Sequence, residues 1–281
     1  MKARFAKILV AGEDYAVMDA VTQRVYVSPV TVQRLADRKR GIGFRSLALI
    51  EPPYDPELDF HLRIYDVRGN ESRDCFDAAA ACAVYAVQKS LAFGTELGFS
   101  SLWGRIRAAG GAGGTVDLWA DPPDFAPAAV PFRAQSAEKI YILQSQGRNV
   151  LCSAMRFGTP FCAAESVDAG GDSAGAAGEG SSEADRLCAG LAAHERFPEG
   201  CAACMYEIVS RDQVRLTGLS GAGIGVAAAA AALAGISRGL LDPAPQVRLG
   251  DQLLRVSWGG GSGKICCQVP VTPVFDGEVE L

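Results

Sequence analysis

Short runs of alternating or continuous apolar residues dominate the chain, separated by turn-forming residues, a pattern that predicts β-strands. We expect strands at residues 7–10, 16–19, 47–51, 61–66, 116–119, 140–144, 150–155, 205–210, 213–217, 246–249 and 253–258. Residues 31–36 read as a short helix, whereas 77–91 and 226–239 are alanine-rich and apolar on nearly all sides. Because a helix that is apolar all round is normally buried, these two helices should lie inside the fold.

The two buried helices occupy similar places in the two halves of the sequence, each after a strand and a turn. This spacing predicts a duplicated α/β (α+β) unit in which a curved sheet wraps around a central helix. The chain has 281 residues, which suits two domains of ordinary size. We expect two pseudo-symmetric domains, the first at residues 1–127 with the C-terminal strand 268–281, and the second at residues 128–267.

Composition and charge argue against nucleic-acid binding and against insertion into a membrane. The net charge is −5 and no long basic stretch is present, which argues against a nucleic-acid partner. The first residues lack the apolar run of a signal peptide, and the alanine run at 227–232 is too short to span a bilayer. We therefore expect a cytoplasmic protein without a membrane partner.

Cysteine and histidine usage gives no sign of a disulfide framework or a metal. The nine cysteines are an odd number without regular spacing, so most should be reduced and buried. The chain has two histidines, and its single C-x-x-C, at Cys201 and Cys204, has no second ligand pair at zinc spacing. We expect no metal and no cofactor.

One cysteine stands out by its position. Cys75 follows the polar segment 68–74 and begins the first alanine-rich helix. The positive end of a helix dipole favours the thiolate form, whereas the neighbouring Asp74 and Asp77 oppose it. Cys75 is thus either a reactive thiolate or an inert buried cysteine.

The segment around Cys75 resembles the first active-site segment of diaminopimelate epimerases, in which Asp-Gly-Ser and a cysteine precede Gly-Asn-Gly. The resemblance spans the chain. Its other segments are Phe5 and Lys7, Asp37-Arg38, Gly41-Ile42-Gly43-Phe44, residues 51–60, residues 194–199 and Phe275-Asp276-Gly277. The resemblance implies two α/β domains with the same architecture. We expect a small-molecule substrate as the partner, and a homodimer is the candidate oligomeric state.

The family works with two cysteines, one on each face of the substrate carbon, and here the second is missing. Matching the glycines of segment 218–225 places Ser220 at the second cysteine position, whereas matching from the downstream segment 238–241 places Ile224 there. Neither residue has a thiol, and serine does not replace a thiolate base.

The resemblance also implies which positions face the substrate, and most of these carry other residues here. Glu13, Ser46 and Asp66 stand where the family has Asn, Gln and Asn. Thr159, Phe161 and Ala202 stand where it has Asn, His and Asn. The paired Glu-Arg of the family appears as Gly218-Leu219, and its Gly-Asn-Gly as Phe76-Asp77-Ala78.

These substitutions favour an isomerase, or a repurposed lyase or cyclase, that transfers a proton with one base. Cys75, Asp77 and Asp66 are the candidate catalytic groups. Glu13, Ser46, Phe76, Thr159, Phe161, Ala202, Leu219 and Ser220 are the candidate substrate-binding residues. The added carboxylates and apolar groups predict an apolar substrate that contains an amine. Two alternatives remain: an inactive homologue that binds a ligand or partner, and a true diaminopimelate epimerase of lysine biosynthesis.

Overall fold

A computed structural model describes residues 2–166 and 182–281. The chain divides into two compact units, Met1–Ala120 with Gln268–Leu281, and Asp121–Cys267. Residues 121–127, which we expected in the first domain, belong to the second unit. No helix in the described ranges is long and apolar enough to cross a membrane.

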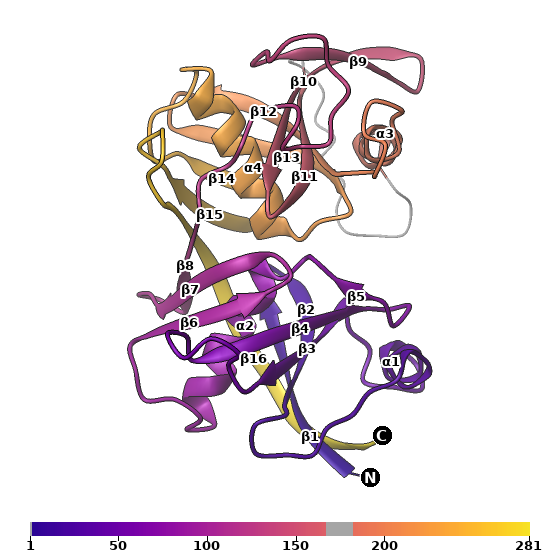
Figure 1. Ribbon diagram of the computed structural model, residues 1–281, viewed down its shortest axis with the longest axis vertical. Coiled ribbons are helices and arrows are strands. Elements are labelled where there is room, and N and C mark those ends of the chain that lie inside the picture. Colours follow the sequence, from indigo (N-terminus) through magenta and orange to yellow (C-terminus); the bar gives the residue numbers. More distant parts are fainter. Residues whose placement is uncertain (1, 167–181) are drawn as a thin grey trace. The chain divides into compact units, whose positions relative to one another are not determined.

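The first unit is a closed barrel around a helix (Figure 1). Its elements are β1 (Lys2–Val10), β2 (Glu13–Asp19), α1 (Pro29–Ala36), β3 (Ser46–Glu51), β4 (Phe60–Asp66), β5 (Glu71–Ser72), α2 (Phe76–Gln88), β6 (Glu96–Ser101), β7 (Gly104–Gly110), β8 (Thr115–Ala120) and most of β16 (Ile265–Glu280). The strands follow the order β1-β2-β3-β4-β6-β7-β8-β16, and β16 pairs with β1 to close the sheet.

Helix α2 occupies the interior of this barrel and contacts β1, β2, β3, β7 and β8. Its residues from Phe76 to Ala83 are all buried, and most of them are alanines. Small side chains let the surrounding strands approach the helix closely on every side. The expected buried helix is therefore confirmed.

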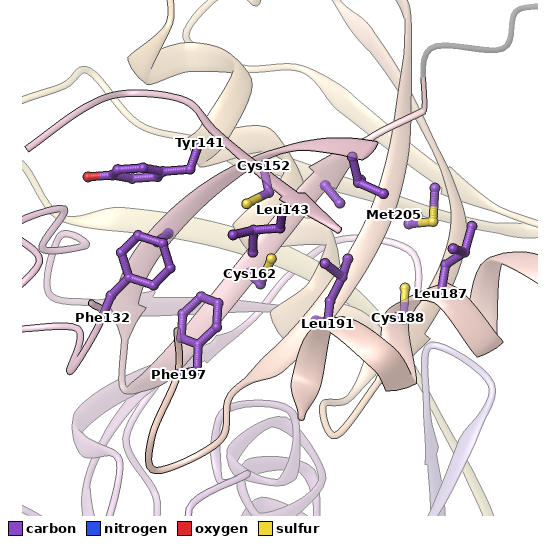
Figure 2. Packing of buried hydrophobic residues seen from close by; sticks show 14 of the residues in the cluster. Phe132, Tyr141, Leu143, Cys152, Cys162, Leu187, Cys188, Leu191, Phe197 and Met205 are labelled. Carbon is purple, nitrogen blue, oxygen red and sulfur yellow. The ribbon is translucent and has the colours of Figure 1, made fainter. Parts of the chain in front are cut away.

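The second unit wraps an open sheet around α4. Its elements are β9 (Tyr141–Ser145), β10 (Arg148–Phe157), β11 (Thr159–Glu165), α3 (Glu183–Ala192), β12 (Ala202–Ser210), β13 (Gln213–Ser220), α4 (Ile224–Ser237), β14 (Gln246–Leu249) and β15 (Gln252–Ser257). The alanine-rich α4 contacts β11 to β15. Helix α3 contacts β9, β11, β12 and β13, and Leu187, Cys188 and Leu191 of α3 pack into a core cluster with Leu143 and Met205 (Figure 2).

The two units repeat one order of strand pairings. In the first, β2 and β3 are parallel, β3 and β4 antiparallel, and β4 and β6 parallel, with α2 between the last pair. In the second, β11 and β12 are parallel, β12 and β13 antiparallel, and β13 and β14 parallel, with α4 between the last pair. The predicted mixed α/β fold with two pseudo-symmetric domains is confirmed, and α4 is the counterpart of α2.

Candidate active site

The start of α2 brings three of the predicted site residues together. Cys75 directly precedes the helix, and Phe76 and Asp77 form its first turn. Cys75 is 1% exposed, and Phe76 and Asp77 are fully buried. Trp103, in the turn between β6 and β7, stacks on Phe76 with ring centroids 5.4 Å apart. The helix dipole favours negative charge in this first turn, where Asp77 supplies a carboxyl group.

Cys75 is held as a neutral thiol. Burial raises the pKa of the Cys75 thiol to about 11, and hydrogen bonds from Ser101 and the Trp103 backbone lower it only in part. Its Sγ donates a hydrogen bond to the Ser72 carbonyl oxygen over 3.4 Å. Burial therefore outweighs the helix dipole, and the structure favours the inert cysteine over the thiolate at neutral pH.

We expect iodoacetamide at neutral pH to label the half-buried Cys266 of the native protein before Cys75. A pKa raised from 9.0 to about 11 lowers the thiolate fraction of Cys75 about 100-fold, and burial limits access further. Peptide mass spectrometry after limiting alkylation measures the order. Preferential labelling of Cys75 would contradict the neutral-thiol assignment.

Unfolding at alkaline pH tests the same assignment independently. Below pH 9 the Cys75 thiol is protonated in both folded and unfolded chains, so its contribution to stability is complete. Between pH 9 and about 11 the unfolded thiol ionises first, and the folded protein loses that contribution. Wild type should therefore lose stability relative to Cys75→Ala over this range.

Arg45 organises the charges beside the helix start. Its Nε lies 2.9 Å from Oε1 of Glu13, and its Nη2 lies 2.6 Å from Oδ2 of Asp74. Its Nη1 donates a 3.4 Å hydrogen bond to the Tyr15 hydroxyl. Burial acts to lower the pKa of Arg45, but Tyr15, Asp74 and Glu13 raise it overall. The guanidinium is thus charged and engaged at all three nitrogens, so it is not an open clamp for a substrate carboxylate.

Three neighbouring strands place further predicted residues in one row. Ser46 of β3 is paired in register with Tyr15 of β2 and with Asp66 of β4. Ser46 is buried, and Asp77 is close enough to raise the pKa of Tyr15, although burial is the main cause. Glu13, Ser46, Cys75, Phe76 and Asp77 therefore all belong to one end of the first unit.

Asp66 has a structural task in the turn that follows β4. Its Oδ1 accepts hydrogen bonds from the backbone N–H groups of Arg68 and Asn70, over 2.9 and 2.8 Å. The side-chain amide of Asn70 adds a third contact at 3.3 Å. The Asp66 carboxylate is therefore engaged in holding its own turn.

The remaining predicted binding residues lie in the second unit. Phe161 and Ala202 are paired in register on β11 and β12, and both are buried. Thr159 begins β11, and Leu219 and Ser220 end β13. The backbone N–H of Leu219 donates to Oδ1 of Asp185 on α3 over 3.1 Å.

The counterpart of Cys75 in the second unit has no reactive side chain. Gly223 directly precedes α4, as Cys75 directly precedes α2, and Ala222 comes before it. Ser220 is the last residue of β13 and Ile224 is already helical. The structural counterpart of Cys75 is therefore Gly223 or, allowing for one residue at a helix end, Ala222, and neither Ser220 nor Ile224 lies at that place.

Gly218 lies where α3 packs on β13. A Cβ at Gly218 would lie 2.7 Å from both the carbonyl carbon and the Cβ of Ala184 in α3. Helix α3 thus packs directly on β13 at this point, and no side chain fits between them.

Gly218→Ala should lower the free energy of unfolding by about 1–3 kcal/mol, because α3 must move away from β13. Gly110→Ala is the matched control on β7, where no heavy atom lies within 4 Å of a Cβ. It should be neutral or about 0.5 kcal/mol more stable. Chemical denaturation measures both, and equal values would mean that the α3 contact does not limit this position.

Sequence reasoning missed three residues of this end of the first unit, Tyr15, Arg45 and Trp103, and named Asp74 only as a charge beside Cys75. Opposite charges at Glu13, Arg45 and Asp74, each beside a predicted strand or helix end, were the available signal. In the described part of the chain, no group of three or more His, Cys, Asp or Glu side chains is arranged to hold a metal ion.

No protein-family profile matches the sequence. Solved structures with the same fold exist, however. A hydroxyproline epimerase from Agrobacterium vitis, with bound trans-4-hydroxy-L-proline, matches at a TM-score of 0.65 and 12% identity, over 99% of this chain and 92% of that one. A methylitaconate-Δ-isomerase matches at 0.61 and 12%, over 99% and 95%.

A phenazine biosynthesis PhzF family protein from Enterococcus faecalis matches at a TM-score of 0.58 and 12% identity, over the full length of both chains. The narrower resemblance to diaminopimelate epimerases stays a prediction. What these matches show is the fold: the chain has the two-unit α/β architecture of these three solved structures.

Proposed function

We propose that this protein is an isomerase that moves a proton within a small, amine-containing, apolar substrate by means of one acid/base group, Asp77. The observation that carries the proposal is the asymmetry of the two helix starts. The first turn of α2 has a buried carboxyl group, whereas α4 begins after Ala222 and Gly223.

A single acid/base group limits the kinds of proton transfer that the protein could catalyse. Epimerisation removes a proton from one face of a carbon and returns a proton to the opposite face, which calls for two groups. A single carboxylate takes the proton from one carbon, the C–H electron pair forms a new double bond, and the former double-bond electrons accept a proton from the same carboxyl group at the third carbon. The carboxyl proton exchanges with solvent between the two steps, so heavy water labels the third carbon. A 1,3-proton shift of this kind balances without a second base or an oxidant.

Asp77 is the best candidate among the three predicted catalytic groups. Cys75 is a neutral thiol at neutral pH, and Asp66 holds the turn after β4. Asp77 alone combines a carboxyl group, complete burial and a place in the first turn of a helix. In this scheme Cys75 and Phe76 line the site, and Asp77 moves the proton.

Charge and surface chemistry support an amine as the substrate group. Arg45 is engaged by Glu13 and Asp74, so these three side chains together contribute one net negative charge beside Asp77. Phe76 and Trp103 add stacked aromatic faces, which attract cations. Arg45 is the one cation among the side chains named here, and it is already paired with Glu13 and Asp74. A dicarboxylate substrate would therefore find no available positive charge among them. The methylitaconate-Δ-isomerase has the same fold, which supports an isomerase as the enzyme class.

The proposal is tested by incubating the protein in heavy water with unsaturated amines and amino acids, and with methylitaconate and diaminopimelate as dicarboxylate comparators. We expect deuterium at the third carbon of at least one unsaturated amine, and neither exchange nor interconversion of diaminopimelate isomers. Proton NMR follows each substrate. Exchange confined to the dicarboxylates would overturn both the chemistry and the substrate class.

An inactive binding protein is the second candidate, and the burial of both Cys75 and Asp77 favours it. Thermal shift on the same panel separates the two. Stabilisation by amines without deuterium incorporation would replace the isomerase by a ligand-binding role.

A further inference from the structure

A concave site lies in the second unit, at the opposite end of α4 from Gly223. The pocket has a volume of about 390 Å³ and is lined by Pro123, Phe125, Ile236, Ser237, Trp258, Gly260 and Gly261. Helix α4 has 14 residues, so at about 1.5 Å per residue its two ends are roughly 20 Å apart. The pocket is therefore separate from the start of α4, and none of its lining residues belongs to the group proposed for proton transfer.

The lining defines a flat, uncharged ligand. Phe125 and Trp258 supply aromatic surfaces with ring centroids 6.4 Å apart, and Pro123 and Ile236 are apolar. None of the seven lining residues is charged. The volume lies within the usual range for small-molecule pockets, which are mostly apolar with a few placed polar groups. The Lys139 ammonium donates to the backbone carbonyl of Ser237 over 2.9 Å, and Lys264 forms an ion pair with Asp121.

Trp258 supplies an unsatisfied polar group at this pocket. The residue is 6% exposed, and its indole Nε1–H is buried without a hydrogen-bond partner. An indole nitrogen is a donor only, so it needs an acceptor from outside the side chain. A buried donor without a partner is rare in native proteins and favours a ligand that supplies one.

The turn after Trp258 is loosely packed. Gly260 and Gly261 have φ values of 84° and 59°, and a Cβ on either would meet no heavy atom within 4 Å. Because the indole nitrogen is buried, a movement of this turn is the step by which an acceptor in the pocket would reach it.

We propose that this pocket is an accessory binding site for a small, uncharged, planar molecule that carries one hydrogen-bond acceptor, which receives the Trp258 indole N–H. The proposal goes beyond the isomerase function and does not depend on it. The acceptor replaces the missing partner of the indole, and the planar part packs against Phe125 and Trp258.

Two probes of nearly equal shape test this. Acetophenone has a carbonyl acceptor, and α-methylstyrene has a CH₂ group in its place. Titrations followed by the indole N–H resonances of ¹⁵N-labelled protein should show acetophenone binding about two- to tenfold more tightly, the range for one uncharged hydrogen bond. Its binding should move the Trp258 resonance, with those of Trp103 and Trp119 unchanged.

Two variants complete the experiment. Trp258→Phe keeps an aromatic ring without the N–H, so the two probes should bind equally. Ile236→Phe fills the pocket and should weaken both. Equal binding of both probes to wild type would overturn the acceptor role, and shifts confined to Trp103 would assign the ligand to the α2 site instead. Absence of binding by either probe would overturn the accessory site itself.

Discussion

Asp77→Asn should lower the rate of deuterium incorporation into the substrate by about 10²- to 10⁴-fold, the usual contribution of one general acid/base group. The amide keeps the shape of the side chain at the buried start of α2 but neither accepts nor returns a proton at neutral pH. The loss should appear in the rate at saturating substrate rather than in substrate affinity.

Cys75→Ser and Asp66→Asn discriminate between the three candidate catalytic groups. Cys75→Ser should stay within about tenfold of wild type, because a neutral thiol is not the base. Asp66→Asn should keep the rate, since an amide oxygen still accepts the N–H groups of Arg68 and Asn70. If Asp66→Asn or Cys75→Ser abolishes exchange while Asp77→Asn does not, Asp77 is not the proton-transfer group. Circular dichroism of each variant controls for folding.

Apolar periodicity was sufficient for most of the fold. Each predicted strand and helix overlaps an element of the same type, including the two buried helices. The sequence pattern missed β5, β6, β7 and β11, whereas the C-terminal strand expected at 268–281 is present as β16, a 16-residue strand that contains Pro270 and Pro273. Proline normally interrupts a strand, and here the pairing of β1 with β16 shifts register next to the Ile8–Pro273 pair. Pro273 is thus accommodated at the register shift between β1 and β16, the pairing that closes the barrel. The sequence of β16 alone does not show this shift, because it depends on the pairing with β1.

Helix α3 was missed for a different reason. It is only 10 residues long, and its start depends on a capping box between Ser182 and Asp185 rather than on a long apolar face. It also explains Gly218, which the sequence alone presents as a lost substrate contact. Packing of α3 on β13, a contact between segments far apart in the chain, gives that glycine its role.

The place of Cys75 at a helix start could be predicted from the sequence, but the ionisation state of its thiol could not. The sequence does not show whether the helix dipole or burial has the larger effect on the Cys75 pKa, and in the structure burial has. The glycine-rich segment 218–225 can be aligned in more than one way. Gly223 is therefore identified as the counterpart of Cys75 only from the residue at which α4 begins. Arg45 was missed because Glu13 and Asp74 come from separate segments that the barrel brings together.

Arg45→Gln should lower the free energy of unfolding at neutral pH by about 3–5 kcal/mol, the range for removing one partner of a largely buried ion pair. The side chain is 24% exposed and is the cation shared by Glu13 and Asp74. In the variant, the carboxylates of Glu13 and Asp74 lose the positive charge of Arg45. Guanidinium denaturation measures the change.

Arg63→Gln is the matched control on the surface of the same unit. Arg63 is 38% exposed and pairs with Glu71 at 3.0 Å, so its loss should cost about 0–1 kcal/mol. Equal losses for both variants would mean that Arg45 does not organise the charges beside Asp77.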